Sequence, residues 1–310
     1  MSAILCISLK TMKPEPLPPA AIVCLGNFDG LHLAHRELLE NAKKLRLHCL
    51  PNAACGVFCF SELSSDHLSN MPPAHLCTLE QKLELFASCG MEYAFIAEFP
   101  EIKDLSPAEF ATEILQKQCN CAGIVCGFNF RFGKDGKGTP ELLEELLHCP
   151  VSIQQKVTFN GNTVSSTYIR QLLFEGNAEE AAKLLARPYS FSAPVLHGKH
   201  LGTQLGTPTI NQRIPPKMLT PLRGVYVTEC EVDGKSYRAV TNVGLRPTVE
   251  ENALVNCESF LLDFSGDLYH KTIRTGFLKY LRPEIRFSSQ EELRDQIERD
   301  AKAAREYSPL

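Results

Sequence analysis

A short apolar run that ends at a glycine and leads into a helical pattern most restricts the fold of this chain. Ala21–Leu25 is the apolar run, Gly26 ends it, and Leu33–Leu47 has apolar residues at helical spacing. The same alternation continues through the first half of the sequence. The further expected elements are strands at Gly56–Phe60, Tyr93–Ala97 and Gly123–Cys126, and helices at Thr78–Ser88 and Pro107–Gln118. This order predicts an α/β domain in which helices flank a parallel sheet.

The pattern changes after a helical stretch, Ser166–Ala186, that is broken at Gly176 and stopped by Arg187-Pro188. Strand-like segments joined by turns follow it. These segments are Val225–Val232, Ser236–Val243 and Leu254–Phe264, and a charged helical pattern covers Ser289–Tyr307. The sequence therefore predicts two domains, residues 1–186 and residues 187–310. The second is expected to be a small antiparallel β-barrel with a C-terminal helix.

Composition excludes several classes of protein. A length of 310 residues suits two domains, and a net charge of −4 gives no general attraction to nucleic acid or to anionic membranes. The 13 cysteines include no C-x-x-C pair and no common zinc spacing. The N-terminus lacks a secretory signal pattern, and no stretch is long enough to span a bilayer. We therefore expect a cytoplasmic protein with free thiols and without a nucleic-acid or membrane partner, while the oligomeric state is not indicated.

The stretch from Gly26 to His35 has the composition of a phosphate-binding turn. Glycines let a backbone approach a ligand, and a helix N-terminus offers unpaired amides. His32 and His35 are three residues apart, so both project from the first helical turn and could stabilise charge on a phosphorus centre. An isolated His-x-x-His is more often structural, but strand, turn and histidine pair together favour function. The candidate ligand-binding residues here are Gly26, Asn27, Phe28, Asp29 and Gly30.

Two further segments of the first half are suited to a nucleotide. One starts a helix with hydroxyls and an arginine, which are Ser165, Ser166, Thr167 and Arg170. It is equally compatible with an ordinary helix N-cap. The other, Gly127–Gly136, follows a strand but is not a P-loop, because its glycine spacing is one residue too long and Asp135 replaces the magnesium-binding hydroxyl. Its Asn129 and Arg131 are expected to line a nucleotide pocket.

A glycine-spaced loop in the second half leads into a Thr-x-Asn pair. In an extended segment Thr209 and Asn211 lie on one side, and their oxygens suit Mg²⁺ held on nucleotide phosphates. An ordinary glycine-rich turn remains the alternative. The candidate loop residues are Gly198, Lys199, Gly206 and Pro208. Glu258, in an otherwise apolar strand, is the candidate general base, or else an outward-facing strand residue.

These motifs together resemble the bacterial bifunctional riboflavin kinase/FAD synthetase family. Gly26–His35, Gly127–Gly133 and Ser165–Arg170 look like its FMN adenylyltransferase module, which is similar to Rossmann-like nucleotidyltransferases. The second half resembles riboflavin kinase through the glycine-rich loop and several shared segments. These segments are Pro208–Asn211, Arg223–Tyr226, Asn242–Thr248, Leu262–Tyr269 and Leu281–Glu284.

The resemblance implies two reactions that use ATP and Mg²⁺. Riboflavin would be phosphorylated to FMN, with Thr209 and Asn211 handling Mg-ATP and Glu258 acting as base on the ribityl 5′-hydroxyl. The FMN phosphate would then attack the α-phosphorus of ATP, giving FAD and pyrophosphate. His32 and His35 would stabilise that transition state. The residues expected to hold phosphates are Ser165, Ser166, Thr167 and Arg170.

The chain departs from the family pattern at several positions. The family's Thr-Phe-x-Pro-His-Pro segment reads Cys59–Ser64 here, and Ala34 replaces a glycine. In the loop and strand of the second half, Thr203, Thr207 and Ile210 replace Arg, Phe and Ala. One alternative is thus a monofunctional riboflavin kinase whose first domain only binds flavin or regulates. Another is a nucleotidyltransferase for pantetheine phosphate or nicotinamide mononucleotide, which would leave the barrel without a function.

Overall fold

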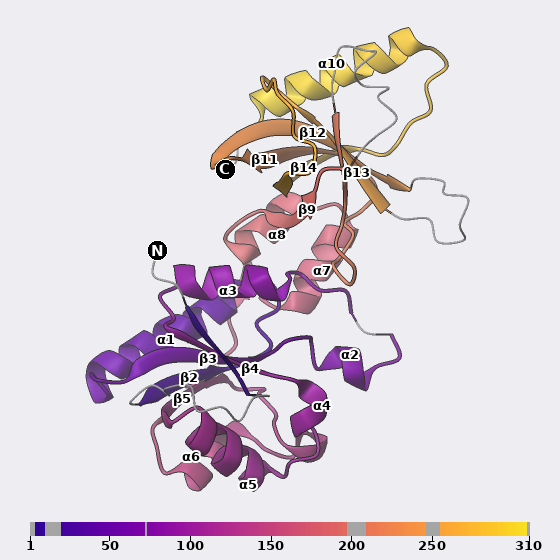
Figure 1. Ribbon diagram of the computed structural model, residues 1–310. Helices are drawn as coiled ribbons and strands as arrows, with labels where there is room; N and C mark the ends of the chain where they lie inside the picture. The colour runs from indigo at the N-terminus through magenta and orange to yellow at the C-terminus, as the bar shows by residue number, and fades with distance from the viewer. Residues whose placement is uncertain (1–3, 10–19, 72, 197–208, 246–254, 309–310) are drawn as a thin grey trace. The chain divides into compact units, whose positions relative to one another are not determined.

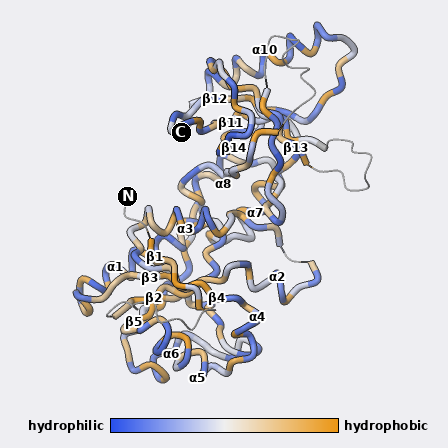
Figure 2. The backbone as a smooth tube through the Cα atoms, viewed as in Figure 1, coloured by the Kyte–Doolittle hydropathy of each residue, from blue (hydrophilic) through white to orange (hydrophobic). Residues whose placement is uncertain are grey.

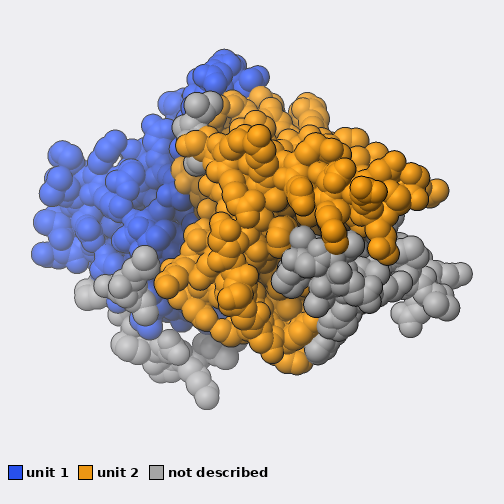
Figure 3. Space-filling view, turned by 90° about the horizontal axis from the view of Figure 1, so that it is seen from above, with its two compact units in different colours: residues 1–166 blue, residues 167–310 orange. Residues whose placement is uncertain are grey.

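The computed structural model describes residues 4–9, 20–71, 73–196, 209–245 and 255–308. Their contacts divide the chain into two compact units, residues 1–166 and residues 167–310 (Figure 3). The two units divide after Ser166, whereas the sequence predicts a domain boundary after residue 186. The division reflects contacts alone, so the boundary after residue 186 stays a prediction.

The first unit is an α/β layer structure around a parallel six-stranded sheet (Figure 1). The strand order is β1-β4-β3-β2-β5-β6. The strands are β1 (Leu5–Ser8), β2 (Ala21–Leu25), β3 (Ala54–Phe60), β4 (Tyr93–Ala97), β5 (Cys121–Gly127) and β6 (Val151–Gln154). The chain passes from β2 to β3 on one side, and later places β5 on the other side of β2. The carboxyl ends of β2 and β5 therefore form a topological switch point, where sheets of this kind bind ligands.

Helices cover both faces of this sheet. They are α1 (Leu33–Cys49), α2 (Ser65–Leu68), α3 (Leu79–Ser88), α4 (Phe99–Ile102), α5 (Pro107–Glu109), the π-helix η1 (Phe110–Gln118), the 3-10 turn η2 (Lys134–Gly136) and α6 (Pro140–Leu147). The short hairpin β7 (Thr158–Phe159) and β8 (Asn162–Thr163) follows. Val23 and Leu25 of β2 pack with η1 and α6, whereas Ile22 and Cys24 pack with α1 and α3. Because both faces are covered, β2 is a continuous apolar run, and Figure 2 shows the apolar character of the strands.

The second unit contains two helices and a six-stranded antiparallel sheet. The helices α7 (Ser166–Phe174) and α8 (Ala178–Leu185) precede it. The sheet order is β10 (Thr209–Arg213), β13 (Val255–Leu261), β12 (Lys235–Leu245), β11 (Gly224–Val232), β14 (Thr272–Arg282) and β9 (Tyr189–Pro194). Its two outer strands meet where Leu196 bridges to Asn211, with Leu196 N donating to Asn211 O at 2.8 Å. The predicted small antiparallel barrel is thereby confirmed.

The C-terminal helix α10 (Gln290–Glu306) packs on the outer face of this barrel. Its Ala301 and Ala304 belong to one buried cluster with Val227 and Leu278, and the partly buried Val240 and Phe260 pack against this cluster. The N-cap is Ser289, whose hydroxyl accepts from Glu292 N at 3.1 Å. The predicted C-terminal helix is therefore confirmed.

The barrel interior carries a buried polar network in addition to apolar residues. Gln212 of β10 donates to the carbonyls of Ala193 and Ile273, both at 2.8 Å, and accepts from Thr275 Oγ1 at 2.7 Å. On the neighbouring strands Thr241 donates to Ser259 Oγ at 2.8 Å. Every donor and acceptor in such a network depends on a fixed strand register. The network therefore holds β10 in place against β9 and β14.

Two expected elements differ from those observed. The helix expected over Pro107–Gln118 begins as α5 and continues as a π-helix, in which Cys119 N bonds to Ile114 O. The strand expected over Leu254–Phe264 ends at Leu261, because Asp263 adopts a left-handed conformation with φ 58°.

Candidate active sites

The loop after β2 lies at the switch point and is held in a strained conformation. Phe28 and Leu31 are bulky residues with φ of 50° and 41°, and both are fully buried. Gly30, between them, has φ 81°. Ser166 Oγ donates to Asp29 O at 2.8 Å and so ties this loop to the start of α7. Strain of this kind persists only where surrounding contacts enforce it, and it gathers at ligand-binding loops.

His32 and His35 lie together at the start of α1. Their rings stack with centroids 3.7 Å apart and planes inclined by 13°. His32 is the N-cap, and its Nδ1 accepts from His35 N at 3.4 Å. Since this nitrogen accepts, a neutral His32 carries its proton on Nε2 and can donate from there. The structure thus brings the two predicted histidines into one stacked pair.

The electrostatic environment keeps His35 neutral. Burial, followed by the charges of His32 and Lys82, holds the pKa of His35 well below its usual range. Its Nδ1 is buried and has no hydrogen-bond partner among the described residues. A neutral imidazole at pH 7 can offer one N–H to a phosphate oxygen without the desolvation penalty of a second buried charge.

Lys82 of α3 is a basic residue that the sequence analysis did not select. It is only 3% exposed, and the described part of the chain forms no ion pair with it. Its charge lowers the pKa of His35 and opposes the burial that raises the pKa of Cys59 to about 11. The one available signal was its place four residues before the buried Phe86, on the apolar face of α3. An unpaired buried ammonium is costly unless a ligand anion balances it.

The segment after β3 packs against the loop after β2, although it departs from the family motif. Asp29 Oδ1 accepts from Leu76 N at 2.9 Å, and Asn27 Nδ2 donates to Ser64 Oγ at 3.5 Å. His75 Nε2 bonds both carboxylate oxygens of Asp66, at 3.0 and 2.8 Å. No sequence pattern indicated this histidine–carboxylate pair, because its two members are nine residues apart in an irregular segment. The pair orders the segment that docks on Asp29.

The loop after β5 places its polar side chains outward at the same edge of the sheet. Asn129 and Arg131 are exposed, whereas Phe132 packs in the core. Gly133 has φ 70°, and a Cβ there would lie 2.7 Å from the backbone nitrogen of Pro107, so only glycine fits. A P-loop leads directly into a long helix, whereas this loop is followed by a three-residue 3-10 turn. The structure therefore agrees with the conclusion that the loop is not a P-loop. Because β5 is hydrogen-bonded to β2, Asn129 and Arg131 lie at the edge that carries the histidine pair.

The remaining predicted residues of the first module are divided between the two units. Ser166 supports the loop through Asp29, while Ser165 precedes α7. Thr167 and Arg170 stand on α7 within residues 167–310. Their expected role in holding phosphates stays a prediction.

Three predicted residues of the second module come together on strands β10 and β13. Thr209 Oγ1 donates to Glu258 Oε1 at 2.7 Å, and Asn211 is the direct register partner of Glu258. Asn256 Nδ2 donates to Asn211 Oδ1 at 2.9 Å and so orients that amide. Residues directly opposite in a ladder share a face, so the three side chains form one cluster.

This cluster lies on the outer face of the barrel. Cys257 and Ser259 alternate with Glu258 and are completely buried, whereas Glu258 is half-buried. Glu258 was selected partly because burying a carboxylate in an apolar strand is costly. Since the side chain is only half-buried, that reason does not apply. Its hydrogen bond to Thr209 distinguishes it instead. Gly198, Lys199, Gly206 and Pro208 lie outside the described residues, as do Thr203, Thr207 and the segment 246–248.

The oxygen ligands of the cluster fit a magnesium ion shared with a nucleotide. Thr209 and Asn211 offer one hydroxyl and one amide oxygen on the same face. Among the described residues no group of three His, Cys, Asp or Glu side chains could hold a metal by itself. Mg²⁺ in phosphate-transfer sites commonly has one or two protein ligands plus phosphate oxygens and water. The donor set is compatible with that arrangement.

Comparisons with known proteins match both halves of the chain. Residues 15–168 match the FAD synthetase family and residues 185–308 the riboflavin kinase family. The bifunctional riboflavin kinase/FMN adenylyltransferase of Pseudomonas fluorescens is 33% identical over 96% of this chain and 95% of its own length. That of Escherichia coli K12 is 34% identical over 93% of each.

A solved structure has the same fold over nearly the whole chain. The Streptococcus pneumoniae protein described as a macrolide-efflux protein is 32% identical with a TM-score of 0.90, covering 98% of this chain and all of its own. Within the part of this chain that the structure describes, no helix is both long and apolar enough to cross a membrane.

Proposed function

The chain belongs to the family of bifunctional riboflavin kinases/FMN adenylyltransferases, and we propose that two separate clusters of its residues carry the two reactions. As a member, the enzyme phosphorylates riboflavin with ATP to give FMN and adenylylates FMN with ATP to give FAD and pyrophosphate. The kinase reaction is assigned to Thr209, Asn211 and Glu258. Adenylyl transfer is assigned to His32 and His35.

The observation that carries the kinase assignment is the hydrogen bond between Thr209 and Glu258. Thr209 occupies Oε1 of this carboxylate, so Oε2 is available to accept the proton of the ribityl 5′-hydroxyl as its oxygen attacks the γ-phosphorus of ATP. The bond between that phosphorus and the β,γ-bridging oxygen breaks, and ADP leaves. Thr209 Oγ1 and Asn211 Oδ1 would hold Mg²⁺, which neutralises negative charge on the phosphate chain.

Adenylyl transfer requires charge stabilisation more than proton transfer. A phosphate oxygen of FMN is already an anion, so it attacks the α-phosphorus of ATP directly and pyrophosphate leaves. The Nε2–H of His32 and one N–H of the neutral His35 are suited to donate to the phosphate oxygens that gain charge. The buried charge of Lys82 favours anions at the same place.

The retained histidine pair supports activity of the first module despite the altered Cys59–Ser64 segment. The relatives that match over the whole chain are bifunctional, which disfavours a monofunctional kinase. A nucleotidyltransferase for another substrate would leave the riboflavin kinase match at residues 185–308 unexplained. We also propose a reducing, cytoplasmic location, supported by cysteines that are all free in the described chain.

The test separates the two reactions by substitution. Purified protein is incubated with Mg-ATP and either riboflavin or FMN, and the flavins are separated by chromatography. Glu258→Gln should abolish FMN formation and spare FAD formation from supplied FMN, and His35→Ala should do the reverse. Glu231→Gln, which changes an exposed carboxylate on β11, is the matched control. Loss of both activities in either folded variant would contradict the assignment of separate sites.

A further inference from the structure

Asn242 of β12 has an amide oxygen to which no described residue donates. Its Oδ1 is buried and has no hydrogen-bond partner among the described residues. Its Nδ2 donates to Glu284 Oε1 at 3.0 Å. Because only the nitrogen of an amide can donate to a carboxylate, this bond fixes which atom is the oxygen. A buried acceptor without a donor is unfavourable, so a group from outside the described chain is expected to supply one.

The position of Asn242 places that acceptor beside the kinase cluster. Asn242 and Glu258 are direct partners in the β12–β13 ladder, and Glu258 and Asn211 are direct partners in the β13–β10 ladder. The three side chains therefore form a row on one face, with neighbouring Cβ atoms roughly 5 Å apart. A donor that reaches Asn242 Oδ1 lies next to the proposed base.

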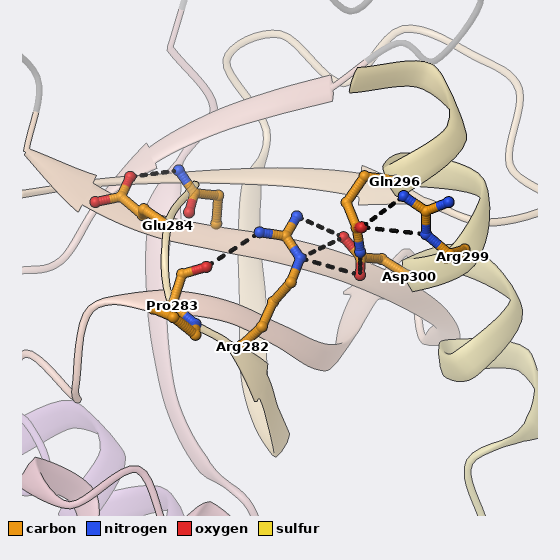
Figure 4. A network of polar contacts seen from close by, with 7 residues as sticks. Arg282, Pro283, Glu284, Gln296, Arg299 and Asp300 are labelled. Atoms are coloured by element: carbon orange, nitrogen blue, oxygen red, sulfur yellow. Dashed lines mark hydrogen bonds and ion pairs between the residues drawn. The ribbon is translucent and has the colours of Figure 1, made fainter. Parts of the chain in front are cut away.

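Glu284 follows a strand end that is anchored to α10. It follows Arg282, whose guanidinium donates to Pro283 O at 3.1 Å and to both carboxylate oxygens of Asp300 on α10 (Figure 4). Gly244 leaves the space that the Glu284 carboxylate occupies, because a Cβ there would collide with Oε1. Glu284 itself is exposed, and its carboxylate bonds the Asn242 nitrogen over the space that Gly244 leaves open.

The chemistry of the substrates limits which donor can fit. Phosphate oxygens and flavin carbonyls accept and cannot donate, whereas the flavin N3–H, the adenine amino group and the hydroxyls of both substrates can donate. Of these donors the ribityl hydroxyls lie nearest the reacting group: C4′, which is bonded to the reacting C5′, carries a hydroxyl, and the 5′-hydroxyl must reach Glu258. A hydroxyl one carbon away then falls within reach of the neighbouring strand.

We propose that Asn242 Oδ1 accepts a hydrogen bond from the ribityl 4′-hydroxyl of riboflavin, and that Glu284 is the positioning residue for this amide. The proposal depends on the placement of the reacting 5′-hydroxyl at Glu258. It makes Asn242 a residue that selects for a polyol substrate, because a substrate without that hydroxyl leaves the amide oxygen unpaired.

Steady-state kinetics of FMN formation with riboflavin and with 4′-deoxyriboflavin test the proposal. The wild-type enzyme should prefer riboflavin about 10- to 100-fold in kcat/KM. Asn242→Ala should lose most of this preference, with an unchanged KM for Mg-ATP. FAD formation from supplied FMN should also be unchanged, while the unchanged KM for Mg-ATP in FMN formation controls for folding of the unit that carries Asn242.

Variants of Glu284 test its role in orientation. Glu284→Ala should lower the preference for riboflavin, chiefly through the KM for riboflavin. Glu284→Gln should restore part of it, because the amide oxygen of glutamine can still accept from Asn242. Glu231→Ala, on the exposed side of β11, should leave the preference unchanged.

The outcomes separate this proposal from the function on which it depends. If Glu258→Gln formed FMN at the wild-type rate, the reacting 5′-hydroxyl would not depend on Glu258. Both the proposed function and this proposal would then be wrong. If Glu258→Gln is inactive as a kinase but Asn242→Ala lowers kcat/KM equally for both flavins, this proposal alone fails. A change confined to the KM for Mg-ATP would assign the amide to the nucleotide and also overturn it.

Discussion

Removal of Asp300 tests how the C-terminal helix supports the kinase unit. Arg282 Nε lies 3.2 and 3.1 Å from the two oxygens of Asp300, and Arg282 Nη2 lies 2.7 Å from Oδ2. Gln296 Nε2 also donates to Asp300 Oδ1 at 2.8 Å. The side chains of Arg282 and Asp300 are only 19% and 7% exposed. This ion pair joins β14 to α10, as Figure 4 shows.

The expected loss of folding free energy follows from the groups that Asp300→Ala leaves without their partner. The guanidinium of Arg282 stays largely buried without its counter-ion, and the Gln296 amide loses its acceptor. Breaking a buried pair by removing one partner costs about 3–5 kcal/mol of folding free energy. Replacing both members with apolar residues, as in Arg282→Met/Asp300→Leu, should recover most of this loss, because no unpaired charge remains.

Thermal inactivation of the two activities in the full chain provides the assay. For Asp300→Ala the temperature at which FMN-forming activity is lost should fall by on the order of 10 °C. The temperature at which FAD-forming activity from supplied FMN is lost should fall less, because the ion pair joins β14 to α10, whereas of the expected adenylylation residues only Thr167 and Arg170 lie within residues 167–310. A shift of FMN-forming activity under about 2 °C, or a double variant as unstable as the single one, would refute the reasoning.

Three further predictions concern the first unit. The depressed pKa of His35 means that the unfolded chain binds a proton below about pH 6.5 that the folded chain does not bind, so the free energy of unfolding should decline from pH 7 to pH 5. Urea denaturation should show a smaller decline in His35→Gln. Lys82→Met should lower FAD formation about 10-fold or more in chromatographic assays, while the free energy of unfolding stays equal or rises, because the change removes a buried charge that has no ion-pair partner among the described residues. Gly133→Ala should lower the free energy of unfolding by about 2–4 kcal/mol, because φ is 70° and the new Cβ meets Pro107. Gly161→Ala, with φ 82° and open space, should cost only about 1 kcal/mol.

Strands of the first unit could be predicted where an apolar run is ended by a residue such as glycine. Ala21–Leu25 was predicted with the observed bounds, because all five residues are buried and Gly26 ends the run. The strand β1 has mostly exposed residues and gives no such pattern. The π-helix η1 has the same apolar residues as an α-helix, and only its hydrogen bonds differ. Local sequence does not encode that choice strongly.

Residues of the candidate sites could likewise be predicted only where a local sequence pattern places them. Thr209 and Asn211 could be placed on one face because alternation along a strand is a local property. The bond from Thr209 to Glu258 joins residues 49 positions apart and required the observed register. Asn242 was missed because its significance depends on an amide oxygen that the described residues leave without a donor, and Lys82 because its significance depends on burial. Such information arises only from tertiary packing.

The most direct measurement of the central claim is complementation between two single-site variants supplied with riboflavin and Mg-ATP. Glu258→Gln alone should form neither FMN nor FAD, and His35→Ala alone should accumulate FMN. A mixture of the two should form FAD, because FMN made by the His35 variant reaches the intact adenylylation site of the Glu258 variant. Two folded variants whose mixture forms no FAD would contradict the account of two separate sites.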